Sequence, residues 1–229
     1  MNRSTGTLFI LISIFTNPVV ADTADFEGIS AKLGINQLSL DIEQTNYIDN
    51  GVADPLLIVD KLSEGKTAAE IAVNYTWAIN ESWLLSLGYE STLGSQDYGV
   101  VGFTYNGVRT NADANNGLVY EVDSSSSFVV APGILLSPNT ALFFRVGQSN
   151  LKIKNYNRDD DSTVNLKHSG VLYGLGIEHN YNDTFFVYGS YDIVDYDNKT
   201  RDFVPDPNPS STDQKVDSSS LKLGLGFRF

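Results

Sequence analysis

The sequence predicts an all-β fold: an eight-stranded antiparallel up-and-down transmembrane β-barrel. Apolar residues alternate with polar or small residues over many short stretches, which is the two-residue period of a strand. Short turns and long polar connections follow one another in strict alternation along the chain. Helical periodicity is scarce, and no stretch of the expected mature chain reaches the roughly 18 consecutive apolar residues of a transmembrane helix.

Three pairs of alternating runs surround links of only three or four residues, 80–82, 137–139 and 180–183. Two alternating runs around so short a link are typical of a β-hairpin. One further strand at each end of the chain brings the predicted number to eight. The predicted strands are 26–40, 71–79, 83–90, 128–136, 140–149, 171–179, 184–196 and 219–229.

The connections between these hairpins are long and rich in Asp, Asn, Ser and Gly, and they cover about 43–66, 92–125, 151–168 and 197–217. Alternate connections of an antiparallel meander lie at opposite ends, so all short turns gather at one end and all long loops at the other. This sorting is typical of outer-membrane barrels, with short periplasmic turns and long extracellular loops. A soluble sandwich or barrel has no need of it.

The polar faces of the predicted strands combine charge with glycine. In the last strand, Lys222, Gly224, Gly226 and Arg228 alternate with an apolar face that ends on Phe229. Glycine weakens a solvent-facing strand but suits the narrow interior of an eight-stranded barrel. We therefore expect a filled barrel with an interior charge network of Lys32, Glu90, Arg145, Glu178, Asp192, Lys222 and Arg228.

The alternation drifts in one place. Leu151 and Ile153 lie on the face opposite to Val146, although all three are apolar. Either a β-bulge or a strand leaving the membrane would explain this change.

Aromatic residues gather near the ends of the predicted strands, as expected for rings that favour the headgroup zone of a bilayer. The predicted aromatic girdles contain Trp77, Trp83, Tyr89, Phe185, Tyr191 and Phe227.

The first segment predicts export. A basic residue, a short apolar run and small residues before Asp22 are typical of a cleavable signal peptide over 1–21, which leaves 22–229 as one barrel domain. The formal charge of −13 argues against nucleic acid as a partner, because phosphates would be repelled. The chain has no cysteine, which excludes disulfides and thiolate metal sites.

At three segments the chain resembles the bacterial OmpA/OmpX-like outer-membrane β-barrel superfamily, which includes opacity-protein-like surface antigens. The segments are 131–154, 185–198 and the terminal LGLGFRF. The resemblance implies a sealed barrel in a Gram-negative outer membrane, in contact with lipid and lipopolysaccharide, and a surface role such as adhesion or membrane integrity. It also implies that Phe229 belongs to the signal read by the barrel-assembly machinery.

We expect no cofactor, no metal and no catalytic residue. His168 and Ser169 are successive strand residues, so their side chains should point to opposite faces and cannot form a nucleophile–base pair. The spacing of the acidic runs matches no ordered calcium loop. Three other functions stay open: a barrel enzyme that modifies lipid A or phospholipid, a narrow porin-like channel, and a soluble ligand carrier with an apolar lumen.

Overall fold

The computed structural model describes residues 23–49, 52–53, 57–105, 107–113, 116–158, 163–204 and 210–229. The predicted signal peptide, 1–21, lies outside the described residues. Among the described residues, no helix is long and apolar enough to cross a membrane.

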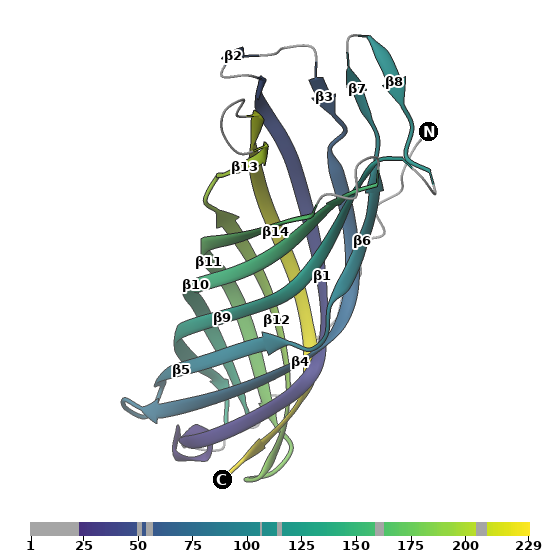
Figure 1. Ribbon diagram of the computed structural model, residues 1–229. Helices are drawn as coiled ribbons and strands as arrows, with labels where there is room; N and C mark the ends of the chain where they lie inside the picture. The colour runs from purple at the N-terminus through teal and green to yellow at the C-terminus, as the bar shows by residue number, and fades with distance from the viewer. Residues whose placement is uncertain are drawn as a thin grey trace, which may run out of the picture.

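Eight long strands form a closed ring, which confirms the predicted fold class (Figure 1). Each strand pairs antiparallel with its two neighbours, and the first pairs with the last, from Ser30 opposite Arg228 to Ile48 opposite Ser211. In chain order the ring contains β1 (Gly28–Asp49), β4 (Leu62–Ala78), β5 (Trp83–Thr92), β9 (Leu118–Ser137), β10 (Thr140–Asn157), β11 (Thr163–Asn180), β12 (Phe185–Tyr196) and β14 (Ser210–Arg228).

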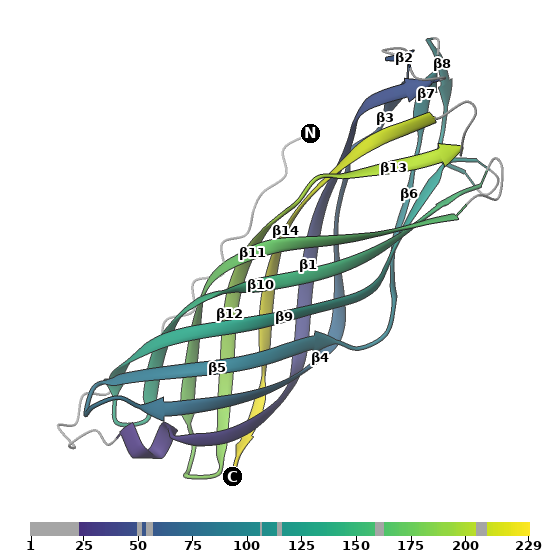
Figure 2. The ribbon, with the colours of Figure 1, turned by 60° about the vertical axis from the view of Figure 1, so that its left-hand side comes forward.

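Six shorter strands and one short 3-10 helix accompany the ring. The helix η1 lies at the same end as the C-terminus and the short turns (Figure 2). The short strands all lie in the connections at the opposite end. These elements are η1 (Thr23–Phe26), β2 (Val52–Ala53), β3 (Leu57–Val59), β6 (Gln96–Val101), β7 (Phe103–Tyr105), β8 (Val108–Thr110) and β13 (Lys199–Val204).

Asparagine side chains shape two of the short turns. The Oδ1 atom of Asn80 accepts hydrogen bonds from the backbone N–H groups of Ser82 and Trp83, each at 3.0 Å. Asn182 Oδ1 accepts in the same way from Thr184 and Phe185, at 2.9 and 2.7 Å. An asparagine that bonds the backbone two and three residues ahead stabilises a tight turn, which keeps these connections short.

The strands change character partway along their length, and β1 shows this most clearly. Its outward residues Ile29, Leu33 and Ile35 are 51%, 61% and 54% exposed, but the next outward residues are Gln37 and Ser39. The inward residues change in the opposite sense, from Lys32, Gly34 and Asn36 to the buried Leu38, Leu40 and Ile42.

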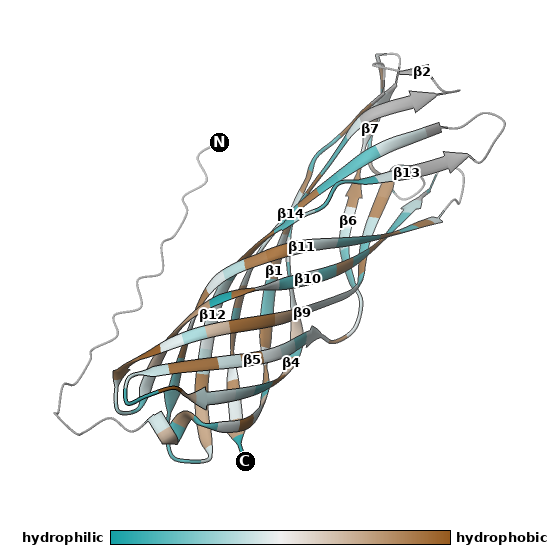
Figure 3. Ribbon diagram, turned by 90° about the vertical axis from the view of Figure 1, so that its left-hand side faces the viewer, coloured by the Kyte–Doolittle hydropathy of each residue, from teal (hydrophilic) through white to brown (hydrophobic). Residues whose placement is uncertain are grey.

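In all eight strands of the ring the outward apolar run ends at about the same level. We call the last large apolar outward residue of each strand the outer boundary: Ile35, Ile71, Tyr89, Phe128, Val146, Val171, Ile193 and Leu221. Between the short turns and this boundary the wall is apolar outside and polar inside, as expected of a barrel in lipid. Apolar and polar residues follow one another along these strands (Figure 3). Beyond the boundary the outward residues are mostly polar, and buried apolar residues appear on the inward face of β1, β9, β10, β11, β12 and β14.

Much of the segments predicted as connections is strand in the structure, because the predicted strands stop short of their observed ends. Strands β1, β9, β10, β11 and β14 continue well past the outer boundary and remain paired there. Their inward apolar residues account for the drift noted at Leu151 and Ile153, which are 1% and 0% exposed. The pairing of β10 with β11 runs without a shift from Thr140 to Tyr156, so β10 itself carries no bulge. The register with β9 shifts between Lys152 and Ile153, where Asp123 of β9 is the extra residue.

Beyond the outer boundary the ring opens into two sheets that face each other. β4 pairs with β5 only over Glu70–Ala78, and β11 pairs with β12 only from Gly170 onward. Farther out, β6 pairs with β9 and β13 pairs with β14. One sheet therefore has the order β6-β9-β10-β11 and the other the order β13-β14-β1-β4. We call this part of the molecule the sandwich.

An apolar core fills the space between the two sheets. Tyr98, Tyr120 and Val216 are each at most 1% exposed, and they pack with Leu40, Ile42, Leu151 and Ile153. Hydrogen bonds also cross from sheet to sheet. Gln44 Nε2 donates to the Tyr120 hydroxyl at 2.8 Å, and the Tyr98 hydroxyl donates to the Leu38 carbonyl at 3.0 Å. The sandwich thus has the filled interior of a soluble β-sandwich.

Candidate functional site

Arg145 lies at the centre of the barrel between two carboxylates. Its Nη2 atom is 2.8 Å from Glu90 Oε1, and its Nε atom is 2.7 Å from Asp192 Oδ1. The three residues come from β10, β5 and β12, and each is at most 7% exposed. A guanidinium shared by two carboxylates offsets the cost of burying all three charges.

Lys222 of β14 joins the same cluster. Its ammonium lies 3.1 Å from Glu70 and 3.3 Å from Asp192, and it also pairs with Glu90. Asn36 Nδ2 donates to Glu70 at 3.0 Å. We call Glu70, Glu90, Arg145, Asp192 and Lys222 the central cluster.

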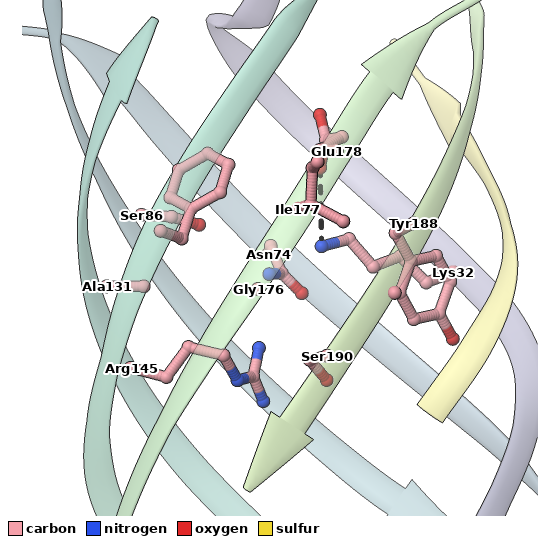
Figure 4. Close-up of a pocket in the computed structure, with 12 residues that line it drawn as sticks. Lys32, Asn74, Ser86, Ala131, Arg145, Gly176, Ile177, Glu178, Tyr188 and Ser190 are labelled. Atoms are coloured by element: carbon pink, nitrogen blue, oxygen red, sulfur yellow. Dashed lines mark ion pairs between the residues drawn. The ribbon is translucent and has the colours of Figure 1, made fainter. Parts of the chain in front are cut away.

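A second cluster closes the barrel near the short turns. Glu178 accepts from Arg228 and lies 3.4 Å from the Lys32 ammonium (Figure 4). The Arg228 guanidinium carbon lies 4.9 Å from the centroid of the Phe186 ring and 5.4 Å from that of Phe26 in η1. These are cation–π distances. We call Lys32, Glu178 and Arg228 the turn-side cluster.

The structure places all seven predicted interior charges on the inward face, divided between these two clusters. Sequence reasoning missed Glu70, which precedes the first residue assigned to its strand. The alternation of the strand could have identified Glu70 as an interior residue, because Glu70 shares the inward face with Ala72 and Asn74. With Glu70 included, the two clusters hold four cations and four anions, and their formal charges cancel.

Glycines make room for the inward rings. A Cβ atom at Gly226 of β14 would overlap the ring of Phe186, and one at Gly34 of β1 would lie 2.6 Å from the Tyr188 hydroxyl. Any larger residue at these two positions would therefore displace an interior ring.

Two small cavities lie inside the barrel, each of about 20 Å³, which is room for one or two water molecules. One is lined by Lys32, Arg145, Glu178, Tyr188 and Ser190 (Figure 4). The other is lined by residues that include Glu70, Glu90, Ser149 and Lys222. Charged side chains of the central cluster separate them. The two cavities thus offer room for ordered water.

All six residues predicted for the aromatic girdles point outward, with exposures between 37% and 55%. Tyr89 and Tyr191 lie at or next to the outer boundary. The other four lie near the short turns, where the rings of Phe185 and Phe227 meet edge to face at 5.2 Å. Phe229 is 77% exposed, and its backbone N–H donates to the Ile29 carbonyl at 3.0 Å.

The two histidines lie far apart along β11. His168 is 1% exposed in the sandwich, where its Nδ1 atom is 3.0 Å from the Asp197 carbonyl and its Nε2 atom is 3.2 Å from Gln214 Oε1. His179 lies near the short turns, 2.9 Å from the Thr140 hydroxyl. The Ser169 hydroxyl bonds to Asn150, so it makes no contact with the His168 ring.

An exposed ion pair stabilises the connection at the far end of the sandwich. Arg109 of β8 donates two hydrogen bonds to the Asp60 carboxylate, one of them at 2.7 Å. These hydrogen bonds lower the pKa of Asp60 below its ordinary value, and they outweigh the effect of partial burial. Among the described residues, no group of three or more His, Asp or Glu side chains could hold a metal ion.

A closed antiparallel barrel with an apolar outer belt and a charged interior is the architecture of an outer-membrane barrel protein. The chain matches the family model described as "Outer membrane protein beta-barrel domain" over residues 7–229, so it belongs to that family. No curated protein sequence matches it.

Solved structures with a similar fold include OprG from Pseudomonas aeruginosa, at 10% sequence identity and a TM-score of 0.58, with 89% of this chain and 96% of that one covered. Ail of Yersinia pestis, solved with the heparin analogue sucrose octasulfate, has 13% identity and a TM-score of 0.49 over 88% of this chain and 99% of that one. The outer membrane protease OmpT from Escherichia coli has 13% identity and a TM-score of 0.47 over 88% and 96%.

The protein is thus an outer-membrane β-barrel protein of the Gram-negative cell envelope. Barrels of this class have their short turns in the periplasm and their longer connections outside the cell. On this orientation, the turn-side cluster faces the periplasm and the sandwich stands on the cell surface.

Proposed function

We propose that the protein is a non-enzymatic surface protein that makes contacts outside the cell through its sandwich. The observation that carries this proposal is the reversal of hydropathy at the outer boundary. A chain that only had to seal a barrel would have no use for an apolar core beyond the lipid. A filled core outside the membrane instead supports a rigid surface that can bind a partner with little ordering cost.

Acidic side chains dominate the outward face of the β13-β14-β1-β4 sheet. Asp41 and Glu43 of β1 and Asp217 of β14 point away from the core, and Lys61 and Lys215 partly offset them at 3.7 and 3.4 Å. This surface favours binding to basic groups on other cells or surfaces, and the electrostatic attraction should weaken as the salt concentration rises.

The test compares charge reversals at the two ends of the barrel. Asp41→Lys together with Asp217→Lys changes the sandwich, and Glu81→Lys together with Asp183→Lys changes the short turns. Bacteria that carry either variant, at matched surface amounts, are assayed for adhesion to coated surfaces and for dye leakage. We expect only the sandwich variant to alter adhesion. Unchanged adhesion in the sandwich variant, or an equal change in both, would refute the proposal.

Two other functions require different observations. A channel would give stable, ion-selective steps in planar bilayers, whereas the separated cavities favour a sealed barrel. An enzyme acting on lipid A or phospholipid would need a nucleophile and a base in contact, and His168 bonds to a carbonyl and an amide instead. An altered lipid A after His168→Ala would support the enzyme.

A further inference from the structure

One edge of the sandwich presents unpaired backbone groups to solvent. β11 pairs with β10 over Thr163–His179, but its pairing with β12 begins only at Gly170. The last links across this side come from Asp197. Its backbone N–H donates to the Ser169 carbonyl at 2.9 Å, and its Oδ1 accepts from the Ser169 N–H at 2.8 Å. Beyond Ser169, β11 has no ladder partner on this side among the described residues.

The direction of the free groups follows from Ser169. Both its N–H and its C=O point away from β10, and backbone groups point the same way at every second residue of a strand. Lys167, Asn165 and Thr163 therefore direct their N–H and C=O groups toward the open side, and all three residues are exposed. We call Thr163–Ser169 the β11 edge.

The opposite split in the wall, between β4 and β6, is closed at both ends. The Leu93 N–H donates to the Ala69 carbonyl at 2.8 Å, and the Asp60 N–H donates to the Gly102 carbonyl at 3.0 Å. Tyr98 of β6 is buried behind it, with its hydroxyl on the Leu38 carbonyl. That split therefore carries hydrogen bonds at both ends, whereas the described residues place backbone hydrogen bonds at only one end of the opening beside β11, at Ser169.

Positive charge marks the outward face of the β11 edge. Lys167 lies directly opposite Lys152 in the β10–β11 ladder, and like charges in that arrangement destabilise a sheet. Lys152 and Lys154 have acidic neighbours, Asp123 at 2.5 Å and Glu121 at 3.3 Å. Lys167 forms no ion pair with any described residue. This local excess stands out in a chain whose formal charge is −13.

We propose that the β11 edge binds an extended acidic segment of a partner protein as an added β-strand. The free groups of Lys167 and Asn165 would supply main-chain hydrogen bonds, and the lysines would select acidic side chains on the outward face of the added strand. The proposal rests on the surface role proposed above and names the place and chemistry of one contact. The opposing explanation is that Lys167 protects the edge from pairing, as edge lysines do in many sheets.

The experiment uses the full chain in phospholipid nanodiscs and residue-resolved amide hydrogen exchange. The probe is a capped eight-residue peptide that alternates Glu with Val, and the control peptide carries Lys in place of Glu. In the free protein, the amides of Lys167 and Asn165 should exchange at least about tenfold faster than those of Leu166 and His168, which face β10. The acidic peptide should slow Lys167 and Asn165 about tenfold, and the basic peptide should not.

Two matched variants test the edge itself. Asn165→Pro removes an N–H that points away from β10, so the β10 ladder is kept. Thr67→Pro does the same on β4, because Thr67 has the same strand parity as Ala69, whose carbonyl faces Leu93. Binding of the acidic peptide should be lost in Asn165→Pro and kept in Thr67→Pro, and Lys167→Gln should weaken it about twofold to fivefold.

Three results would overturn the edge proposal. They are no protection of the native edge by the acidic peptide, equal binding by Asn165→Pro, or tighter binding by Lys167→Gln, the outcome expected of a protective lysine. The protection measurement on the native chain stands even if a proline variant does not fold. If adhesion depends on Asp41 and Asp217 but the β11 edge binds no peptide, the proposed surface role stands and only the binding site at the β11 edge is refuted.

Discussion

Replacing Leu33 with arginine should lower the free energy of unfolding by about 2–4 kcal/mol, the range for arginine on the lipid face near the bilayer midplane. Leu33 is 61% exposed and lies opposite Leu225, the middle residue of the outward apolar run 221–229. A guanidinium at this level has lipid around it and no acidic neighbour on the outward face.

The same replacement at Ser39 should change stability by less than about 0.5 kcal/mol, as for ordinary surface sites. Ser39 lies on the same outward face of β1, six residues farther along. With a rise of about 3.4 Å per residue and a strand tilt of about 40°, it stands roughly 16 Å from the level of Leu33. Half the apolar belt is about 12 Å, so Ser39 lies in water.

Urea unfolding of the two variants and the parent, refolded into phospholipid vesicles, measures both changes from the shift in midpoint at constant slope. Leu40→Ala completes the set. Its side chain points into the sandwich core and is 1% exposed, so its loss should cost about 2–5 kcal/mol. Equal costs for arginine at Leu33 and Ser39 would mean that the outer boundary is misplaced and would undo the two-part description of the strands.

Three further predictions concern the clusters and the far end of the sandwich. Lys222→Met leaves three carboxylates beside one cation and should lower the free energy of unfolding by about 3–5 kcal/mol in the same assay. Adding Glu90→Gln should restore part of that stability. An unchanged unfolding midpoint would contradict the ion pairs described for the central cluster. In planar bilayers, the native chain should give no stepwise conductance, and regular ion-selective steps would show that the barrel is open. The lowered pKa of Asp60 means that its pair with Arg109 stabilises the fold above the ordinary carboxyl range and is lost as pH falls through the lowered pKa. Protection of the Asp60 amide, measured as its exchange rate relative to the intrinsic rate at each pH, should therefore fall in acid, and Arg109→Gln should remove that pH dependence.

The sequence was sufficient for the barrel because alternation and the sorting of connections are local patterns. The strand count and the closure of β1 on β14 needed only these patterns and the rule that lipid tolerates no open edge. The inward placement of Lys32, Arg145 and Lys222 followed from parity alone. Glu70 was missed because its strand was predicted to begin at Ile71, whereas β4 begins at Leu62.

The sandwich was missed for a different physical reason. Along β1 the apolar residues move from odd to even positions after Ile35, without any insertion. If the outward face is assumed to be apolar along the whole strand, the residues beyond Ile35 resemble a polar loop. The solvent around the strand changes there, and the apolar residues change face with it. A change of phase in an unbroken strand marks the place where a chain leaves lipid.

Strands that run unbroken from the periplasmic side to the outer tip of the sandwich also determine how the molecule would respond to a pull. A tensile load applied at the cell surface acts along β1, β10 and β14, nearly parallel to their axes. Many hydrogen bonds between neighbouring strands then oppose sliding at the same time. If a flexible tether carried the force, these bonds would break one after another. A protein with this geometry can transmit traction from outside directly into its membrane anchor.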